Sequence, residues 1–550
     1  MFEYKGVSVS AGIAVGKLYF YHNLPKEIPE YMVEDPQKEW QRYQDCLQIA
    51  KKQLQQVYDN ACKRISKKES VIFQTHIMIL EDSKFVELVQ AHISEGKNAE
   101  YAVYHASQKL ANLFLALDDE YFKARYTDML DAGHILLDVL INRSGKKLPG
   151  QREPVIIAAS DLMPSDTMSF TKGSVLGFVT NEGSANSHSS IIARTMGLPS
   201  VVQVQEVLAD FDGHMAILDG LLGRLILDPD ETTIAQYQAR KERYEKQQER
   251  LRRQIGLPSE TKEGRYVRLS ADIGRIDEID KVRSNDAQGI GMFHCDALFM
   301  NRDKEPSEEE QFEVYRTIVR SFPGEEVRIC LANGSSEKKM NYLDIPREKN
   351  PALGFRGVRI ALENPAFFRR QLRALCRASG FGKLSIALPM VSSIEEVEYA
   401  KRELSSALEE LRRQGEKTAE HVPLGVVIET PSAALISQEI CQEVDFIVIN
   451  TSNLIQFTLC MDKDNPKLMD FYRPYHLAVK RLLKMVILNA HKAGKKVAVG
   501  GQLAWDASMT PFLLALRTDE LILIPSHLLR VKAAVREMSA QDLKNLLDPI

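Results

Sequence analysis

Apolar positions in the first third of the chain repeat with the period of a helix. A seven-residue spacing, typical of the seam along a long helix, relates Trp40, Leu47, Leu54 and Ala61. Further helices are expected to begin near Ser66, where Glu69 completes a capping-box pattern, and near Ser83 and Asp118. The pattern predicts an all-helical bundle of roughly four helices over residues 34–143.

Short β-rich runs occur on both sides of this bundle. The N-terminal segment looks extended, and from Pro154 onward the apolar runs are VIIAA, SVLGFVT, SVVQV, MAILDG and RLILDP. One helix-like stretch begins after His188. We therefore predict one β/α domain made of residues 1–33 and 144–230, interrupted by the helical insert.

The second half of the chain alternates regularly between strand and helix patterns. Residues 231–262 are predicted to be a helical linker, because the charged stretch at their start has only a narrow apolar stripe. Eight β-like runs follow: YVRLSADI, QGIGMF, EVRICLA, LSIALPMV, LGVVIET, DFIVIN, KVAVGG and ELILIP. Eight β–α units over residues 263–550 predict a (β/α)8 barrel with its chemistry at the C-terminal strand ends. The fold class is therefore multidomain α/β.

Composition narrows the possible environments and partners. The 550 residues have a formal net charge of −4, so no basic surplus indicates nucleic-acid binding. Neither a secretory signal nor an apolar run long enough to cross a bilayer is found, and membrane association is not expected. Seven cysteines without a CxxC pair favour a reducing compartment. We expect a cytoplasmic protein.

His188 is the strongest candidate for chemistry in the N-terminal half. It follows the run SVLGFVT, at the point where NEGSANSHSS turns into a helix. A helix start offers unpaired N–H groups and partial positive charge, and imidazole is nucleophilic near neutral pH. Asn186, Ser187 and Ser189 would help to hold a phosphoryl group there. A histidine in this position alone is more often a cap or a surface residue, so both interpretations stay open.

The string around His188 resembles the phosphohistidine signature of enzyme I of the phosphoenolpyruvate:sugar phosphotransferase system, Gly-Gly-x-Thr-Ser-His followed by a helix ending Ala-Arg. The Ser-His and Ala-Arg pairs match, and the departures are Ser184, Ala185 and Asn186. The resemblance covers almost the whole chain, including HIMILEDSKF in the helical insert and NPALGFRGVRIAL and ETPSAAL in the barrel. It implies a phosphoenolpyruvate-protein phosphotransferase that uses Mg²⁺ and passes the phosphoryl group through His188 to an HPr-like phosphocarrier protein.

The resemblance also places the family's site residues at the barrel strand ends. Retained positions are Lys338 and Arg356 for substrate and Glu429 for metal. Substituted positions are His294 and Cys330 for two arginines, Ser452 and Asn453 for Asn-Asp, Lys463 for arginine, and Gly500 for the proton-donating cysteine. Phosphoenolpyruvate is a trianion that needs several cations, and Mg²⁺ needs carboxylates. We expect weakened Mg²⁺ binding and impaired or lost use of phosphoenolpyruvate.

Three functions remain open at this stage. The first is an enzyme I-like protein that exchanges phosphoryl groups with HPr through His188. The second is a fully active, phosphoenolpyruvate-dependent enzyme with a rewired site, in which His294, Ser452 and Lys463 replace the missing groups. The third is a non-catalytic regulatory protein that binds HPr or a genuine enzyme I. The resemblance further implies a homodimer through the barrel, or a heterodimer with a genuine enzyme I.

Overall fold

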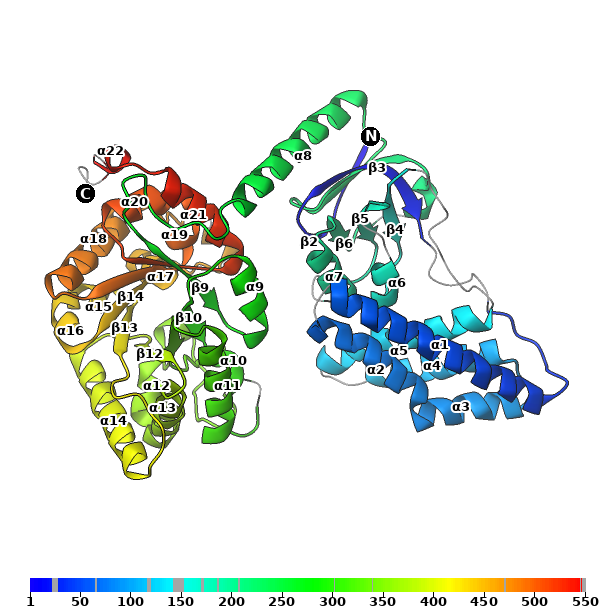
Figure 1. Cartoon of the computed structure of the whole chain (residues 1–550), viewed down its shortest axis with the longest axis horizontal. Helices are drawn as coiled ribbons and strands as arrows, with labels where there is room; N and C mark the ends of the chain where they lie inside the picture. The colour runs from blue at the N-terminus through cyan, green and yellow to red at the C-terminus, as the bar shows by residue number, and fades with distance from the viewer. Residues whose placement is uncertain are drawn as a thin grey trace. The chain divides into compact units, whose positions relative to one another are not determined.

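The computed structural model has the predicted succession of helical bundle, β/α sheet and barrel (Figure 1). It describes residues 1–546 with the exception of 22–27, 65–66, 116–119, 142–152, 170–172, 185–186, 206–207, 301, 339, 469–470 and 545. Residues 1–247 form one compact unit and residues 248–550 another, and the division falls inside helix α8 (Glu231–Arg252). Every residue of α8 is at least partly exposed, as expected for a largely polar helix.

Five helices form the bundle, one more than the sequence pattern predicts. They are α1 (Pro36–Arg64), α2 (Lys67–Glu81), α3 (Ser83–Ser94), α4 (Ala99–Leu115) and α5 (Glu120–Leu140). The predicted seam of α1 faces the core, since Leu54 and Ala61 are fully buried. The additional break, between α3 and α4, contains Gly96 at φ 84° and Asn98. The side chain of Asn98 fixes this turn by accepting from the Tyr31 N–H (3.1 Å). The cap proposed at Ser66 lies outside the described residues.

An eight-stranded mixed sheet forms the rest of the first unit. Its strands are β1 (Phe2–Lys5), β2 (Val7–Ser10), β3 (Ile13–Phe20), β4 (Val155–Ala159), β5 (Val175–Thr180), β6 (Ser200–Val202), β7 (Met215–Asp219) and β8 (Arg224–Leu227), in the order β1-β8-β7-β3-β4-β5-β6-β2. The central run from β3 to β6 is parallel. Helices α6 (Pro164–Ser169) and α7 (His188–Met196) connect its strands, and Ile192 of α7 packs into the core of the bundle. Sheet and bundle therefore share a core at α7.

The second unit is a closed barrel of eight parallel strands, which confirms the predicted fold class. Its strands are β9 (Arg268–Ile273), β10 (Ile290–His294), β11 (Glu326–Cys330), β12 (Lys383–Leu388), β13 (Leu424–Ile428), β14 (Phe446–Asn450), β15 (Lys496–Gly500) and β16 (Glu520–Leu523). Its helices are α9 (Ile279–Ser284), α10 (Asp296–Phe299), α11 (Glu308–Ser321), α12 (Val358–Glu363), α13 (Pro365–Ser379), α14 (Ile394–Arg413), α15 (Pro431–Leu435), α16 (Ser437–Glu443), α17 (Thr451–Leu459), α18 (Leu477–Lys492), α19 (Gln502–Trp505), α20 (Thr510–Ala515), α21 (Leu528–Glu537) and α22 (Ala540–Leu543). Side chains such as Met292, Ala387 and Val448 fill the interior.

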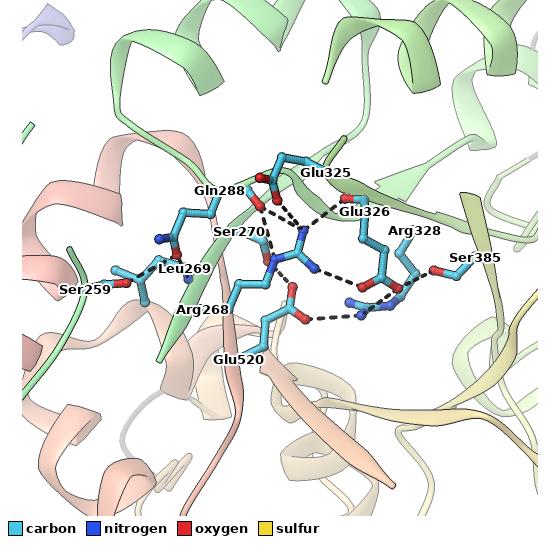
Figure 2. Close-up of polar contacts among 10 residues, drawn as sticks. All are labelled: Ser259, Arg268, Leu269, Ser270, Gln288, Glu325, Glu326, Arg328, Ser385 and Glu520. Atoms are coloured by element: carbon cyan, nitrogen blue, oxygen red, sulfur yellow. Dashed lines mark hydrogen bonds and ion pairs between the residues drawn. The ribbon is translucent and has the colours of Figure 1, made fainter. Parts of the chain in front are cut away.

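A network of buried charges crosses the N-terminal end of the barrel (Figure 2). Arg268 donates to Glu326 (Nη1–Oε2 2.9 Å), and Arg328 donates to Glu520 (Nη2–Oε2 3.1 Å). The Arg328 guanidinium also lies 4.6 Å from the ring centroid of Phe446. Burial raises the pKa of the Glu520 carboxyl, but Arg328 and Arg268 outweigh it, so this pKa is lowered. The network ties β9, β11 and β16 together at the end of the barrel that usually serves stability.

None of the helices in the described ranges combines the length and apolar character needed to cross a bilayer.

Candidate functional site

His188 is the first residue of α7, directly after the N-cap Ser187. The Ser187 side-chain oxygen accepts from the Ser190 N–H (3.3 Å), and Ser189 is buried with its Oγ 3.1 Å from Ser187 Oγ. Gly197 ends the helix in the left-handed region at φ 67°. The backbone of His188 thus lies at a helix start, as predicted, while its side chain and the neighbouring Asn186 are outside the described set.

The barrel residues singled out in the sequence lie around one cavity of about 980 Å³. They are His294, Cys330, Lys338, Arg356, Glu429, Ser452, Asn453, Lys463 and Gly500. They converge because parallel strands of a closed barrel all end at the same face, and each residue lies at a strand end or in the loop or helix that follows it.

Glu429, the metal carboxylate expected from the family resemblance, is buried and surrounded by hydrogen-bond donors. Its Oε1 accepts from the Met390 N–H (2.7 Å), and its Oε2 accepts from the Nδ2 groups of Asn450 (3.1 Å) and Asn453 (2.6 Å). A carboxylate has about four acceptor positions, so one is left. The side chain of Asn453 therefore occupies an acceptor position with its amide and adds no negative charge.

This donor set does not fit a Mg²⁺ ion. Magnesium requires oxygen ligands in near-octahedral geometry, commonly one or two carboxylates with water and phosphate. Here the amide groups of Asn450 and Asn453 point N–H donors at the carboxylate oxygens that a metal would use. Within the described residues, no group of three or more His, Cys, Asp or Glu side chains could hold a metal ion.

Two of the cations at the cavity are already paired with carboxylates. His294 Nε2 lies 3.0 Å from Asp272 Oδ1, and Lys338 forms an ion pair with Asp296. Burial lowers the pKa of His294, but Asp272 outweighs it, so this pKa is raised. Burial raises the pKa of Asp296, but Lys338 outweighs it and lowers that pKa. These pairs leave little net positive charge for an anionic substrate.

The other predicted substrate positions differ in what they offer. Cys330 is 3% exposed, and burial raises the pKa of its thiol well above the ordinary value, which keeps it neutral. Arg356 is half-buried and donates one weak hydrogen bond, from Nε to Asn333 Oδ1 (3.4 Å). Lys463 is exposed, and Ser452 Oγ accepts from the Gln502 N–H (2.9 Å). Arg356 is therefore the guanidinium best placed to meet a ligand.

Gly500 ends β15 with room for a side chain. A Cβ built on it would meet Ile522 Cβ at 3.4 Å, an ordinary contact. We expect Gly500→Cys to change the free energy of unfolding by less than about 1 kcal/mol, because no neighbour has to move. Chemical denaturation of the two proteins measures this difference.

The matched control is Gly501→Cys in the next position. Gly501 has φ 80°, and a Cβ there would lie 2.8 Å from the Ser452 nitrogen. Strain and collision together should cost roughly 1–3 kcal/mol or more. Equal losses for the two variants would contradict this description of the β15 end.

Four residues of the cavity region were not singled out in the sequence. Asp272 and Asn450 lie at the ends of β9 and β14, where the rule used for the other strand ends would have found them. Asp296 begins α10, and Trp505 ends α19 with an indole N–H that is buried and has no acceptor among the described residues. No strand pattern in the sequence indicates Asp296 or Trp505.

Three family models match successive parts of the chain. They are PEP-utilising enzyme, N-terminal, over residues 5–125; PEP-utilising enzyme, mobile domain, over residues 151–223; and PEP-utilising enzyme, PEP-binding domain, over residues 247–540. These matches cover the bundle, much of the sheet and the barrel in turn, and they define the class of protein as a phosphoenolpyruvate-utilising enzyme.

Curated relatives match over nearly the full length. A phosphoenolpyruvate-protein phosphotransferase of Staphylococcus carnosus (strain TM300) is 34% identical over 549 residues, which is 99% of this chain and 95% of the relative. That of Bacillus subtilis (strain 168) is 33% identical over 560 residues, covering 100% of this chain and 97% of the relative. An NMR solution structure of Enzyme I (nEIt) is 33% identical with a TM-score of 0.38, over 44% of this chain and 99% of that one. The chain belongs to the enzyme I family of phosphoenolpyruvate-protein phosphotransferases.

Proposed function

We propose that this protein exchanges phosphoryl groups between His188 and an HPr-like phosphocarrier protein, while its barrel does not use phosphoenolpyruvate at the rates of its relatives. The observation that carries the second part is the environment of Glu429. Amides of Asn450 and Asn453 donate to its Oε2 where a second carboxylate and a metal are expected from the family resemblance.

The proposed transfer at His188 needs a nucleophile and a site for the incoming group. One imidazole nitrogen of His188 attacks the phosphorus of a phosphohistidine on the carrier; a new P–N bond forms as the carrier's P–N bond breaks, and the reverse step returns the group. The start of α7 supplies backbone N–H groups and partial positive charge, which stabilise the phosphoryl oxygens. The family model of the PEP-utilising enzyme mobile domain matches residues 151–223, a range that includes His188, and this match supports the proposed role.

The charges around the barrel cavity support impaired phosphoenolpyruvate use. Among the described residues that line it, five are Lys or Arg and five are Asp or Glu. A divalent cation would neutralise a bound phosphate and polarise it, but Asn453 does not supply the charge needed to hold one. A trianion would therefore meet a lining whose Lys and Arg charges are matched by its Asp and Glu charges, without a metal ion to add positive charge.

The remaining parts of the proposal follow the family resemblance. Residues 1–33 and 144–230 would form the phosphohistidine domain, 34–143 the carrier-docking insert, 231–262 the linker and 263–550 the barrel. The barrel would then serve in a homodimer, in a heterodimer with a genuine enzyme I, or in binding another ligand.

Intact-mass analysis after incubation with a phosphorylated HPr tests the proposal. We expect a mass gain of one phosphoryl group on wild-type protein and none on His188→Ala. His214→Ala is the matched control, because His214 lies in the same unit but its Nδ1 is 2.9 Å from Asp228 Oδ1. If the wild-type protein binds HPr but gains no phosphoryl mass, the proposed transfer is refuted and a non-catalytic binding role is favoured.

A further inference from the structure

The barrel cavity has a volume of about 980 Å³, and its Lys and Arg side chains are matched in number by its Asp and Glu side chains. Its lining includes Glu429 and Asp272 on one hand and Arg356 and Lys463 on the other. Since five Lys or Arg and five Asp or Glu side chains line it, in addition to His294, the cavity complements a ligand with both charges better than a polyanion.

Two charged side chains of the lining that lack an oppositely charged partner among the described residues have opposite signs. Glu429 is 2% exposed, and within the described residues it forms no ion pair. Its single remaining acceptor position suits one N–H of an ammonium group, which needs no octahedral ligand set. Arg356 also forms no ion pair in the described part of the chain, and its Nη groups have the geometry that binds a carboxylate with two hydrogen bonds.

The rest of the lining is largely apolar. Met292, Met390, Phe457 and Trp505 contribute thioether and aromatic surface, and Gly500 leaves space next to Ile522. Such surface gains free energy by removing an apolar group from water.

We propose that the barrel binds a small zwitterion of the α-amino acid type with an apolar side chain, its ammonium at Glu429 and its carboxylate at Arg356. This proposal rests on the part of the proposed function in which phosphoenolpyruvate no longer occupies the cavity.

Isothermal titration of the full chain with three probes tests the proposal. They are L-leucine, 4-methylpentanoate, which lacks the amine, and 3-methylbutylamine, which lacks the carboxylate. We expect leucine to bind at least about tenfold more tightly than either analogue, the effect of one additional charge-assisted interaction. No binding of leucine, or equal binding of all three probes, would overturn the proposal.

Two variants separate the charged contacts. Arg356→Gln should weaken leucine and the acid but leave the amine unchanged, and Glu429→Gln should weaken leucine and the amine but leave the acid unchanged. Leu488→Ala, exposed on α18 and outside the cavity lining, is the control. If L-leucine does not bind while phosphorylated HPr still labels His188, only this inference is wrong. Tight binding of phosphoenolpyruvate at the same cavity would contradict both this inference and the proposed loss of phosphoenolpyruvate use.

Discussion

Phosphoenolpyruvate with Mg²⁺ is expected to phosphorylate this protein at least ~10³-fold more slowly than the enzyme I relatives. Each lost charge-assisted hydrogen bond to an anion is worth roughly 1.5–3 kcal/mol, and His294, Cys330 and Lys463 replace three arginines by the family resemblance. At the low end of this range, the three changes together remove about 4–5 kcal/mol of interaction free energy with the anion. By the same resemblance, Gly500 replaces the proton-donating cysteine, and the loss of a general acid commonly slows a reaction by a further ~10²–10⁴-fold. Radiolabel transfer from phosphoenolpyruvate, compared side by side with the Bacillus subtilis relative, measures this rate.

A single substitution tests whether Asn453 weakens Mg²⁺ binding at Glu429, as we propose. Asn453→Asp would place a carboxylate where an amide now lies 2.6 Å from Glu429 Oε2, so the two charges repel unless a cation lies between them. We expect Mg²⁺ to raise the thermal midpoint of this variant and leave that of the wild type unchanged. Stabilisation of both proteins by Mg²⁺, together with phosphorylation within tenfold of the relative, would contradict the account.

The second large effect is expected at the opposite end of the barrel. Arg328→Met should lower the free energy of unfolding of the barrel by roughly 3–5 kcal/mol, because it leaves a buried charge unpaired. Glu520 is 7% exposed and would lose the guanidinium that lies 3.1 Å from its Oε2. The Gly291 carbonyl would also lose its hydrogen bond from Arg328 Nη1 (2.8 Å). Denaturant unfolding in a Trp40→Phe background, in which Trp505 alone reports, follows this transition.

Two controls define the origin of that loss. Lys401→Met removes one partner of an exposed ion pair with Glu443 (3.0 Å) and should cost no more than about 1 kcal/mol. The double variant Arg328→Met, Glu520→Gln should lose less than the sum of the two single changes, since neither charge is then left alone. Strict additivity would show that packing, and not the buried charge, sets the cost.

The strand-end positions could be predicted because two regularities act together. The alternation of β-like runs and helical segments locates eight strands, and the closure of a parallel barrel brings their ends to one face. His294 on β10 and Gly500 on β15 are distant in the sequence, yet both line the same cavity. The same reasoning placed His188 at a helix start, since an apolar strand followed by Gly and small polar residues ends in a turn.

Other features depend on side-chain partners that no periodic pattern encodes. The family resemblance indicates that Asn453 stands where a metal-binding carboxylate is expected, but not that its amide and that of Asn450 both donate to Glu429. It also does not show that Asp272 pairs with His294. In the bundle, a polar turn that contains Gly96 and Asn98 separates α3 from α4, and the start of α4 was not among the helix starts predicted from the sequence.

The central claim is that phosphoryl groups reach this protein from a carrier and not from the barrel. Mass measurement of one preparation incubated in parallel with phosphorylated HPr and with phosphoenolpyruvate plus Mg²⁺ tests it most directly. We expect one added phosphoryl group, lost in His188→Ala, from the carrier alone on the timescale at which the relative is fully labelled. Complete labelling of His188 by phosphoenolpyruvate on that timescale would contradict the claim.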